Sequence, residues 1–398
     1  MPPGIYQGNL VLDKPLVLEG VGRPVIRGDG KGSVITATAD RCTIRGFRIE
    51  RSGPMLVEED SGILLKSSGN QVIDNVLEDV LFGIYLLRSN RNTIRGNLIR
   101  GRAYLEVGER GSGLHIYDSV DNTIAGNTIS QVRDGMYLQN AHRSLIRANR
   151  ASDLRYGLHY MFSNENTFED NTFERSMAGA AIMYSRRIDF RRNAFLDHRG
   201  FSSYGILFQD SDDCTAEHNV IAGNVVGIFL EALRTSVFRG NLIAANDTAI
   251  EVFSSAADNQ FSGNNFIENL SPITLVGKRT TTRWDGNYWS EYAGYDLDGD
   301  GVGDVPFRIQ NLFEHLEGNF PRLRVFFFSP ASQALTLAEK AFPVIEGSRE
   351  FDRYPLMKPV PLPVNLPAPE RTGSRLAFTL PAFMVALSGA VVWRGRRR

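Results

Sequence analysis

Short apolar segments recur along the chain, each led by a small residue. The pattern is Gly or Ala, an apolar residue, a variable residue and a second apolar residue, and it returns about every 22 to 24 residues, with one gap of about 30. This alternation is typical of a strand with one buried face. The segments are Gly62–Leu65, Gly83–Leu86, Gly113–Ile116, Gly135–Leu138, Gly157–Tyr160, Ala181–Tyr184, Gly205–Phe208, Gly227–Leu230 and Ala249–Val252.

A second short β-prone segment lies between these strands and ends in asparagine, as in Thr93–Asn97 and Thr123–Asn127. Asparagine tolerates the left-handed turn conformation, and stacked asparagine side chains can hydrogen-bond along a solenoid. We therefore expect a structural asparagine ladder. Its other members are Asn75, Asn149, Asn171, Asn193, Asn219, Asn241 and Asn264.

Units of this length with two or three strands and no full-length helix predict an all-β fold, a right-handed parallel β-helix. We expect the solenoid to cover residues 1–270. An aromatic and acidic cap would follow at 271–320, a docking helix with a proline-rich tether at 321–372, and a membrane anchor at 373–398. The chain begins directly in the first coil, so an export signal is expected to be missing from this sequence.

Composition excludes several classes of protein. The formal net charge of −1 argues against a broad nucleic-acid surface. Two cysteines, Cys42 and Cys214, are too few for a disulfide scaffold or a thiolate metal cage. Four histidines, His142, His198, His218 and His315, fall in turns or outside the repeated strands, and we expect them on the surface.

The periodicity ends around Trp284 and Trp289, which we expect to pack over the end of the solenoid. An acidic loop with a glycine turn follows, with acidic residues at Asp296, Asp298, Asp300 and Asp304. Such spacing is typical of a calcium loop, although the bidentate glutamate is absent. The alternative is a solvated acidic turn.

The C-terminal segment carries three further signals. Ser329 and Pro330 have the residue types of a helix start, and Pro343 would end that helix. The run Leu376–Trp393 is apolar and uncharged, long enough for a transmembrane helix, and arginines follow it. The positive-inside rule then leaves the solenoid outside the cytoplasm. The alternative is a buried C-terminal helix.

The outward positions of the repeated strand carry imidazole and thioether groups. Because parallel strands stack coil on coil, we expect one column to hold His115, His159 and Met183, with Met161 two residues along from His159. Thioether and imidazole donors without carboxylates favour Cu(I). The sequence therefore suggests a copper site of His159, Met161, Met183 and His115.

Two alternatives stay open for this face. The methionines and aromatic residues could pack under a loop or against a protein partner, which makes the chain a metal-free scaffold. Tyr137, His115 and His159 could instead act as acid and base in a carbohydrate lyase or epimerase. The column has no cluster of acidic or basic residues of the kind that acidic polysaccharides require.

Motifs spread over most of the chain resemble the NosD family. They are Gly157–Phe162, Ala181–Ser185, Gly286–Tyr292, the Asp296–Asp304 loop, Phe328–Ala331 and Tyr354–Pro359. The resemblance implies a periplasmic, non-catalytic β-helix that works with an ABC transporter, made of the NosF ATPase and the NosY membrane subunit.

The resemblance also implies a role in maturing the copper sites of nitrous oxide reductase, with copper delivered by the NosL chaperone. On this basis the docking surface for the membrane subunit would include Phe326, Phe327, Phe328, Ser329, Pro330 and Leu335. The resemblance does not reach the terminal apolar run, whose role rests on hydropathy alone.

Overall fold

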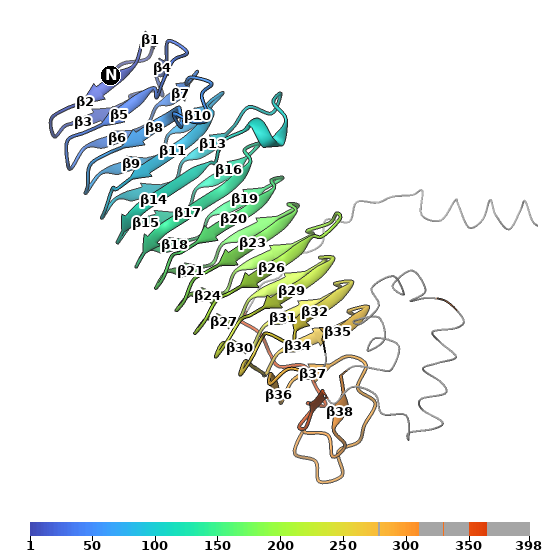
Figure 1. Cartoon of the computed structure of the whole chain (residues 1–398). Coiled ribbons are helices and arrows are strands. Elements are labelled where there is room, and N and C mark those ends of the chain that lie inside the picture. Colours follow the sequence, from blue (N-terminus) through green and yellow to red (C-terminus); the bar gives the residue numbers. More distant parts are fainter. Residues whose placement is uncertain (278, 310–328, 330–349, 364–398) are drawn as a thin grey trace, which may run out of the picture. The chain divides into compact units, whose positions relative to one another are not determined.

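The computed structural model describes residues 1–277, 279–309, 329 and 350–363. Three strands per coil stack into three long sheets, which confirms the predicted all-β parallel β-helix (Figure 1). Among the described residues, the one helical element is a 3-10 turn at Val107–Glu109. All of the described residues belong to one compact unit, Met1–Pro363.

The first sheet has 13 strands. They are β1 (Ile5–Gln7), β4 (Val25–Arg27), β7 (Arg48–Glu50), β10 (Val76–Glu78), β13 (Leu98–Arg100), β16 (Thr128–Ser130), β19 (Arg150–Ser152), β22 (Thr172–Glu174), β25 (Ala194–Leu196), β28 (Val220–Ala222), β31 (Leu242–Ala244), β34 (Asn265–Ile267) and β37 (Tyr288–Trp289).

The second sheet has 12 strands and carries the repeated glycine segments. They are β2 (Leu10–Leu12), β5 (Ile35–Ala37), β8 (Ser61–Leu65), β11 (Phe82–Leu87), β14 (Leu114–Val120), β17 (Asp134–His142), β20 (Tyr156–Met161), β23 (Ala178–Met183), β26 (Tyr204–Gln209), β29 (Val226–Glu231), β32 (Thr248–Phe253) and β35 (Ser271–Val276).

The third sheet has 14 strands. They are β3 (Val17–Glu19), β6 (Thr43–Arg45), β9 (Gln71–Ile73), β12 (Thr93–Arg95), β15 (Thr123–Ala125), β18 (Leu145–Arg147), β21 (Thr167–Glu169), β24 (Asp189–Arg191), β27 (Thr215–Glu217), β30 (Val237–Arg239), β33 (Gln260–Ser262), β36 (Arg283–Asp285), β39 (Phe351–Asp352) and β38 (Phe307–Arg308). The last two strands pair antiparallel.

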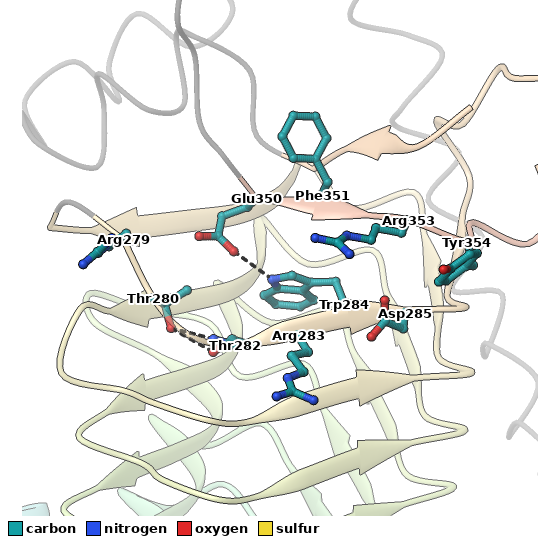
Figure 2. Close-up of a pocket in the computed structure, with 10 residues that line it drawn as sticks. All are labelled: Arg279, Thr280, Thr282, Arg283, Trp284, Asp285, Glu350, Phe351, Arg353 and Tyr354. Atoms are coloured by element: carbon teal, nitrogen blue, oxygen red, sulfur yellow. Dashed lines mark hydrogen bonds between the residues drawn. The ribbon is translucent and has the colours of Figure 1, made fainter. Parts of the chain in front are cut away.

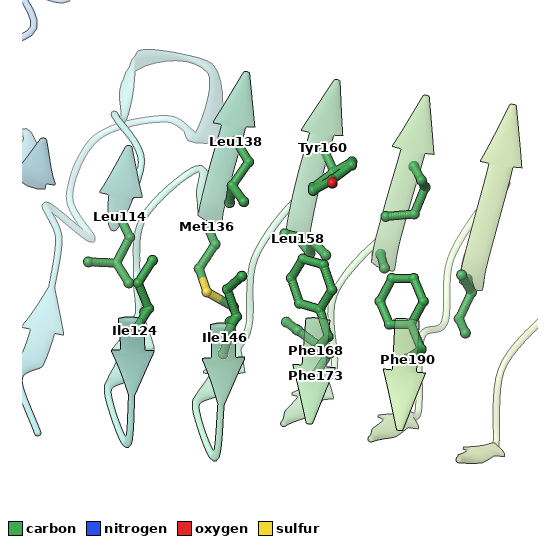
Figure 3. Packing of buried hydrophobic residues seen from close by; sticks show 14 of the residues in the cluster. Leu114, Ile124, Met136, Leu138, Ile146, Leu158, Tyr160, Phe168, Phe173 and Phe190 are labelled. Carbon is green, nitrogen blue, oxygen red and sulfur yellow. The ribbon is translucent and has the colours of Figure 1, made fainter. Parts of the chain in front are cut away.

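The core fills the tube between the sheets with stacks of like residues (Figure 3). Aliphatic residues dominate the early coils, and aromatic rings replace them towards the end. Phe238 and Phe261 stack with centroids 4.3 Å apart, and Trp284 follows Phe261 at 4.6 Å. Trp289 stacks on Phe266 at 4.0 Å. The expected aromatic packing at the solenoid end is confirmed.

The asparagine ladder is confirmed and continuous from Asn75 to Asn287. At each step the backbone N–H and the Nδ2 group of one asparagine donate to the Oδ1 atom of the next, as between Asn149 and Asn171 at 3.0 Å each. The ladder ends on Asp352, whose carboxylate accepts from the N–H and Nδ2 groups of Asn287 at 2.9 Å each.

The expected reason for the asparagines was partly wrong. The left-handed residue is the one that precedes each asparagine, for example Asp170 with φ 55° and Gly240 with φ 60°. The asparagines themselves satisfy buried backbone groups, which would otherwise destabilise each turn.

Glycine at the start of the second-sheet strands is required by close backbone approach. A Cβ atom on Gly157 would lie 2.6 Å from the carbonyl oxygen of Gly179, and one on Gly179 would lie 2.5 Å from that of Gly205. This close approach favours a residue without a side chain, and glycine recurs here once per coil from Gly62 to Gly227, whereas Ala249 takes the place in the next coil.

The three sheets continue past residue 270, through β35, β36 and β37. Both cysteines are buried and unpaired. The helix expected after Ser329, the docking residues other than Ser329, and the apolar run with its arginines lie outside the described residues. Within the described part of the chain, no helix has the length and apolarity needed to cross a membrane.

Candidate metal site

The outward face of the second sheet arranges the predicted ligands differently from the sequence prediction. His159 pairs with Ala181 on the next coil, and Met161 pairs with Met183. The predicted column of His159 and Met183 was therefore wrong by two residues, because Gly179, not Ala181, is the leading residue of that coil. Met183 lies in a second column with Gln139, Met161 and Gln209.

His115 does not join this group. Its ring lies tilted against that of Tyr137, with centroids 4.7 Å apart, and Tyr137 contacts His159 edge-on at 4.8 Å, so a tyrosine lies between the two imidazoles. His115 is also buried, at 7 % exposure, and its pKa falls to about 3 because burial disfavours the charged ring and Arg133 repels it. One ion cannot bind both histidines unless Tyr137 moves.

Asp134, which the sequence analysis missed, holds His159 in place. This carboxylate is fully buried at the start of β17. Its Oδ2 atom lies 3.2 Å from Nδ1 of His159, and Arg155 donates to both oxygens at 2.8 and 2.6 Å. Burial alone would raise the pKa of Asp134, but the hydrogen bonds from His159 and Arg155 lower it.

The contact with Asp134, which is shorter than the 3.4 Å between Nδ1 and Nη2 of Arg155, favours the imidazole tautomer with its proton on Nδ1. When Nδ1–H donates to the carboxylate, the lone pair of Nε2 is left for a metal ion, as in many carboxylate–histidine–metal sites. The His159 side chain keeps 14 % exposure, so a small ion can reach it.

Met161 and Met183 complete the donor set that the structure brings together. Both are half-buried at the ends of β20 and β23. Paired residues on neighbouring strands lie about 5 Å apart, and His159 lies about 6.6 Å along the strand from Met161. These spacings allow two flexible thioethers and one imidazole to meet at one ion. Soft sulfur donors favour Cu(I).

An exposed aromatic pair lies beside the methionines. Phe162 and Tyr184 directly follow Met161 and Met183, stack with centroids 5.1 Å apart and are each 45 % exposed. Along the strands the methionines therefore lie between the column of His115, Tyr137 and His159 and this exposed aromatic pair. This part of the surface can contact another protein.

The acidic loop brings only part of its predicted ligand set together. Carboxylate oxygens of Asp296, Asp298 and Asp300 lie within 4.8 Å of one another. Asp304 instead accepts a hydrogen bond from the N–H of Leu297 at 2.7 Å. Asp296 accepts from Gly299 and Gly301, at 2.7 and 2.9 Å, which gives the loop a structural role of its own. Calcium at this loop stays a prediction.

The expectation for the remaining histidines was wrong for His198. This residue is fully buried, and the N–H of Ser176 lies 3.1 Å from its Nδ1 atom. Burial lowers its pKa to about 4. His142 and His218 are half-buried, and His315 lies outside the described residues.

Comparison with known proteins supports the copper-binding interpretation. A family model described as "Periplasmic copper-binding protein (NosD)" matches residues 100–294, a range that contains Asp134, His159, Met161 and Met183. A protein of Pseudomonas aeruginosa named "Probable ABC transporter binding protein NosD" is 32 % identical over 386 residues, covering 92 % of this chain and 89 % of the relative. The chain belongs to the NosD family.

A second NosD relative, a protein of Stutzerimonas stutzeri with the same name, is 28 % identical to this chain. The match covers 90 % of this chain and 86 % of the relative. Both NosD relatives are named as transporter-binding proteins, and neither name is that of an enzyme. Among solved structures, the family 28 exopolygalacturonase of Yersinia enterocolitica has a TM-score of 0.53 at 12 % identity, covering 72 % of this chain and 71 % of its own. That likeness shows the fold alone.

Proposed function

We propose that this NosD protein handles copper in the periplasm as an accessory of an ABC transporter, for the maturation of the copper sites of nitrous oxide reductase. The observation that carries the proposal is His159, oriented by Asp134 beside Met161 and Met183 on an accessible sheet face. The description of the family as copper-binding and the naming of its relatives as transporter-binding proteins support both the metal and the transporter.

The donor set suits transient binding of Cu(I). Methionine needs no deprotonation, so the site stays available when the pH falls. The side chains of His159, Met161 and Met183 are each partly exposed on the same sheet face. A chaperone of the NosL type can therefore deliver an ion there, and the ion can be passed on. The NosY and NosF type subunits are the proposed transporter partners, with residues 326–335 as the proposed docking segment.

Copper titration tests this function. The full chain without metal is titrated with Cu(I) against a chromophoric chelator, and one equivalent is expected to bind. The triple variant H159A/M161L/M183L is expected to lose that equivalent, because leucine keeps the shape of methionine but not the thioether. Met177→Leu, an exposed methionine outside the site, is the matched control. An unchanged titration in the triple variant would contradict the site.

The same variants separate copper handling from its alternatives. In cells that make nitrous oxide reductase, the triple variant is expected to yield reductase without its full copper content. Normal reductase would instead support a metal-free scaffold. Turnover of a uronate polymer by the wild-type chain, lost in H159A, would support the carbohydrate enzyme; we expect no turnover.

A further inference from the structure

A pocket at the end of the solenoid is separate from the copper face. It has a volume of about 500 Å³ and lies between β36 and β39 (Figure 2). Its charged lining residues are Arg279, Arg283, Asp285, Glu350 and Arg353. This volume is in the range of pockets that hold small organic ligands.

Three arginines give the pocket its character. The side chains of Arg279, Arg283 and Arg353 have no ion pair or hydrogen bond among the described residues, whereas most arginines of the coils pair with a carboxylate on a neighbouring coil. In Figure 2 the guanidinium groups of Arg283 and Arg353 lie on opposite sides of the Trp284 indole. Because all three arginines line one pocket and like charges repel one another, a bound anion would offset their charge.

The two carboxylates of the pocket do not remove this excess of positive charge. Glu350 is buried and accepts a hydrogen bond from Nε1 of Trp284 at 3.1 Å. Burial raises the pKa of Glu350. Even with Glu350 and Asp285 both ionised, the three guanidinium groups, which cannot be deprotonated in proteins, leave a net charge of +1.

We propose that this pocket binds a small organic polyanion of the size of a di- or tricarboxylate. Guanidinium forks match carboxylates in a two-point geometry, and three of them suit a ligand with more than one acidic group. Trp284, Phe351 and Tyr354 supply apolar walls for the ligand's carbon frame. A single small oxyanion would leave most of the volume unfilled.

Fluorescence titration of the metal-free full chain tests this proposal, because Trp284 lines the pocket. Citrate and inorganic phosphate serve as probes, with sodium chloride at matched ionic strength as the blank. Citrate is expected to give a saturable change with a dissociation constant below about 1 mM, and phosphate is expected to bind at least ten-fold more weakly. Calorimetry gives the same constants without relying on tryptophan.

Variants locate the binding. Arg283→Gln and Arg353→Gln are each expected to weaken citrate at least ten-fold, while Arg147→Gln, an exposed arginine at the end of β18, leaves it unchanged. Cu(I) affinity should be the same in all three, so failure here is distinct from failure of the copper site. The proposal is overturned if citrate gives no saturable change, if phosphate binds as tightly, or if Arg147→Gln weakens citrate equally.

Discussion

The carboxylate of Asp134 lies 3.2 Å from Nδ1 of His159, although the two residues belong to strands on neighbouring coils. We expect Asp134→Asn to weaken Cu(I) binding by about 10- to 100-fold, the usual cost of losing a carboxylate that orients a metal-binding histidine. Chelator competition measures this change. Met161 and Met183 remain in the variant, so binding should weaken rather than disappear.

Asp121→Asn is the control for that substitution. Asp121 pairs with Arg143 at 3.0 Å on the surface and has no contact with the site. An equal loss of affinity in both variants would mean that charge alone, and not the orientation of His159, accounts for the effect.

His115→Phe is expected to leave Cu(I) affinity within two-fold of wild type. Tyr137 separates His115 from His159, and phenylalanine can keep the ring contacts of His115 with Tyr85 and Tyr137. The same titration measures it. A loss of five-fold or more would return His115 to the ligand set and would require Tyr137 to move.

Asn171→Ala is expected to destabilise the solenoid by about 2–4 kcal/mol. The N–H and Nδ2 groups of Asn149 would lose their acceptor in a buried turn. Denaturant unfolding measures the free energy, with the neighbouring surface change Thr172→Ala as control. If the two variants were equally stable, water would have to replace the lost acceptor, and the ladder would not be a source of stability.

His198→Asn is expected to reduce the loss of stability in acid. The unfolded histidine protonates near pH 6.5 and the folded one near 4, so the unfolded state binds more protons between these values. The stability that His198 contributes is complete above pH 6.5 and is lost as the pH falls towards 4. This accounts for about 2 kcal/mol between pH 7 and pH 5.

Asparagine fits position 198 because a second ladder continues from it. The N–H of His198 donates to Asn224, which donates in turn to Asn246. The free energy of unfolding at pH 7 and pH 5 measures the effect. A variant that loses as much stability in acid as the wild type would place the acid-sensitive group elsewhere.

The fold was predictable because its cause is local and repeated. The approach of Gly157 to Gly179 favours glycine, which recurs once per coil from Gly62 to Gly227, so the spacing of these glycines in the sequence reports the coil length directly. The asparagine ladder was visible for the same reason. Which residue of each turn is left-handed was not, because asparagine and the residue before it both tolerate that conformation.

The site was predictable only in part. Gly179, Ala180 and Ala181 are three consecutive small residues, and choosing Ala181 as the leading residue shifted the register by two residues, which put Met183 in the column of His159 instead of that of Met161. Asp134 was missed because it lies before the repeated glycine. Only the outward positions that follow the glycine were compared from coil to coil. An acidic residue directly before Gly135, in the coil beside His159, is the signal that could have found it.

The parallel pairing of each coil with only its two neighbours has a consequence for the order of opening. In the first coil the strand residues Ile5, Val11 and Val17 are 57 to 64 % exposed, so this coil has the least burial to hold it closed. Fraying should start there and advance coil by coil, so amide hydrogen exchange should slow from β1 towards β17. His159 and its methionines lie many coils inward, where thermal opening disturbs their spacing least.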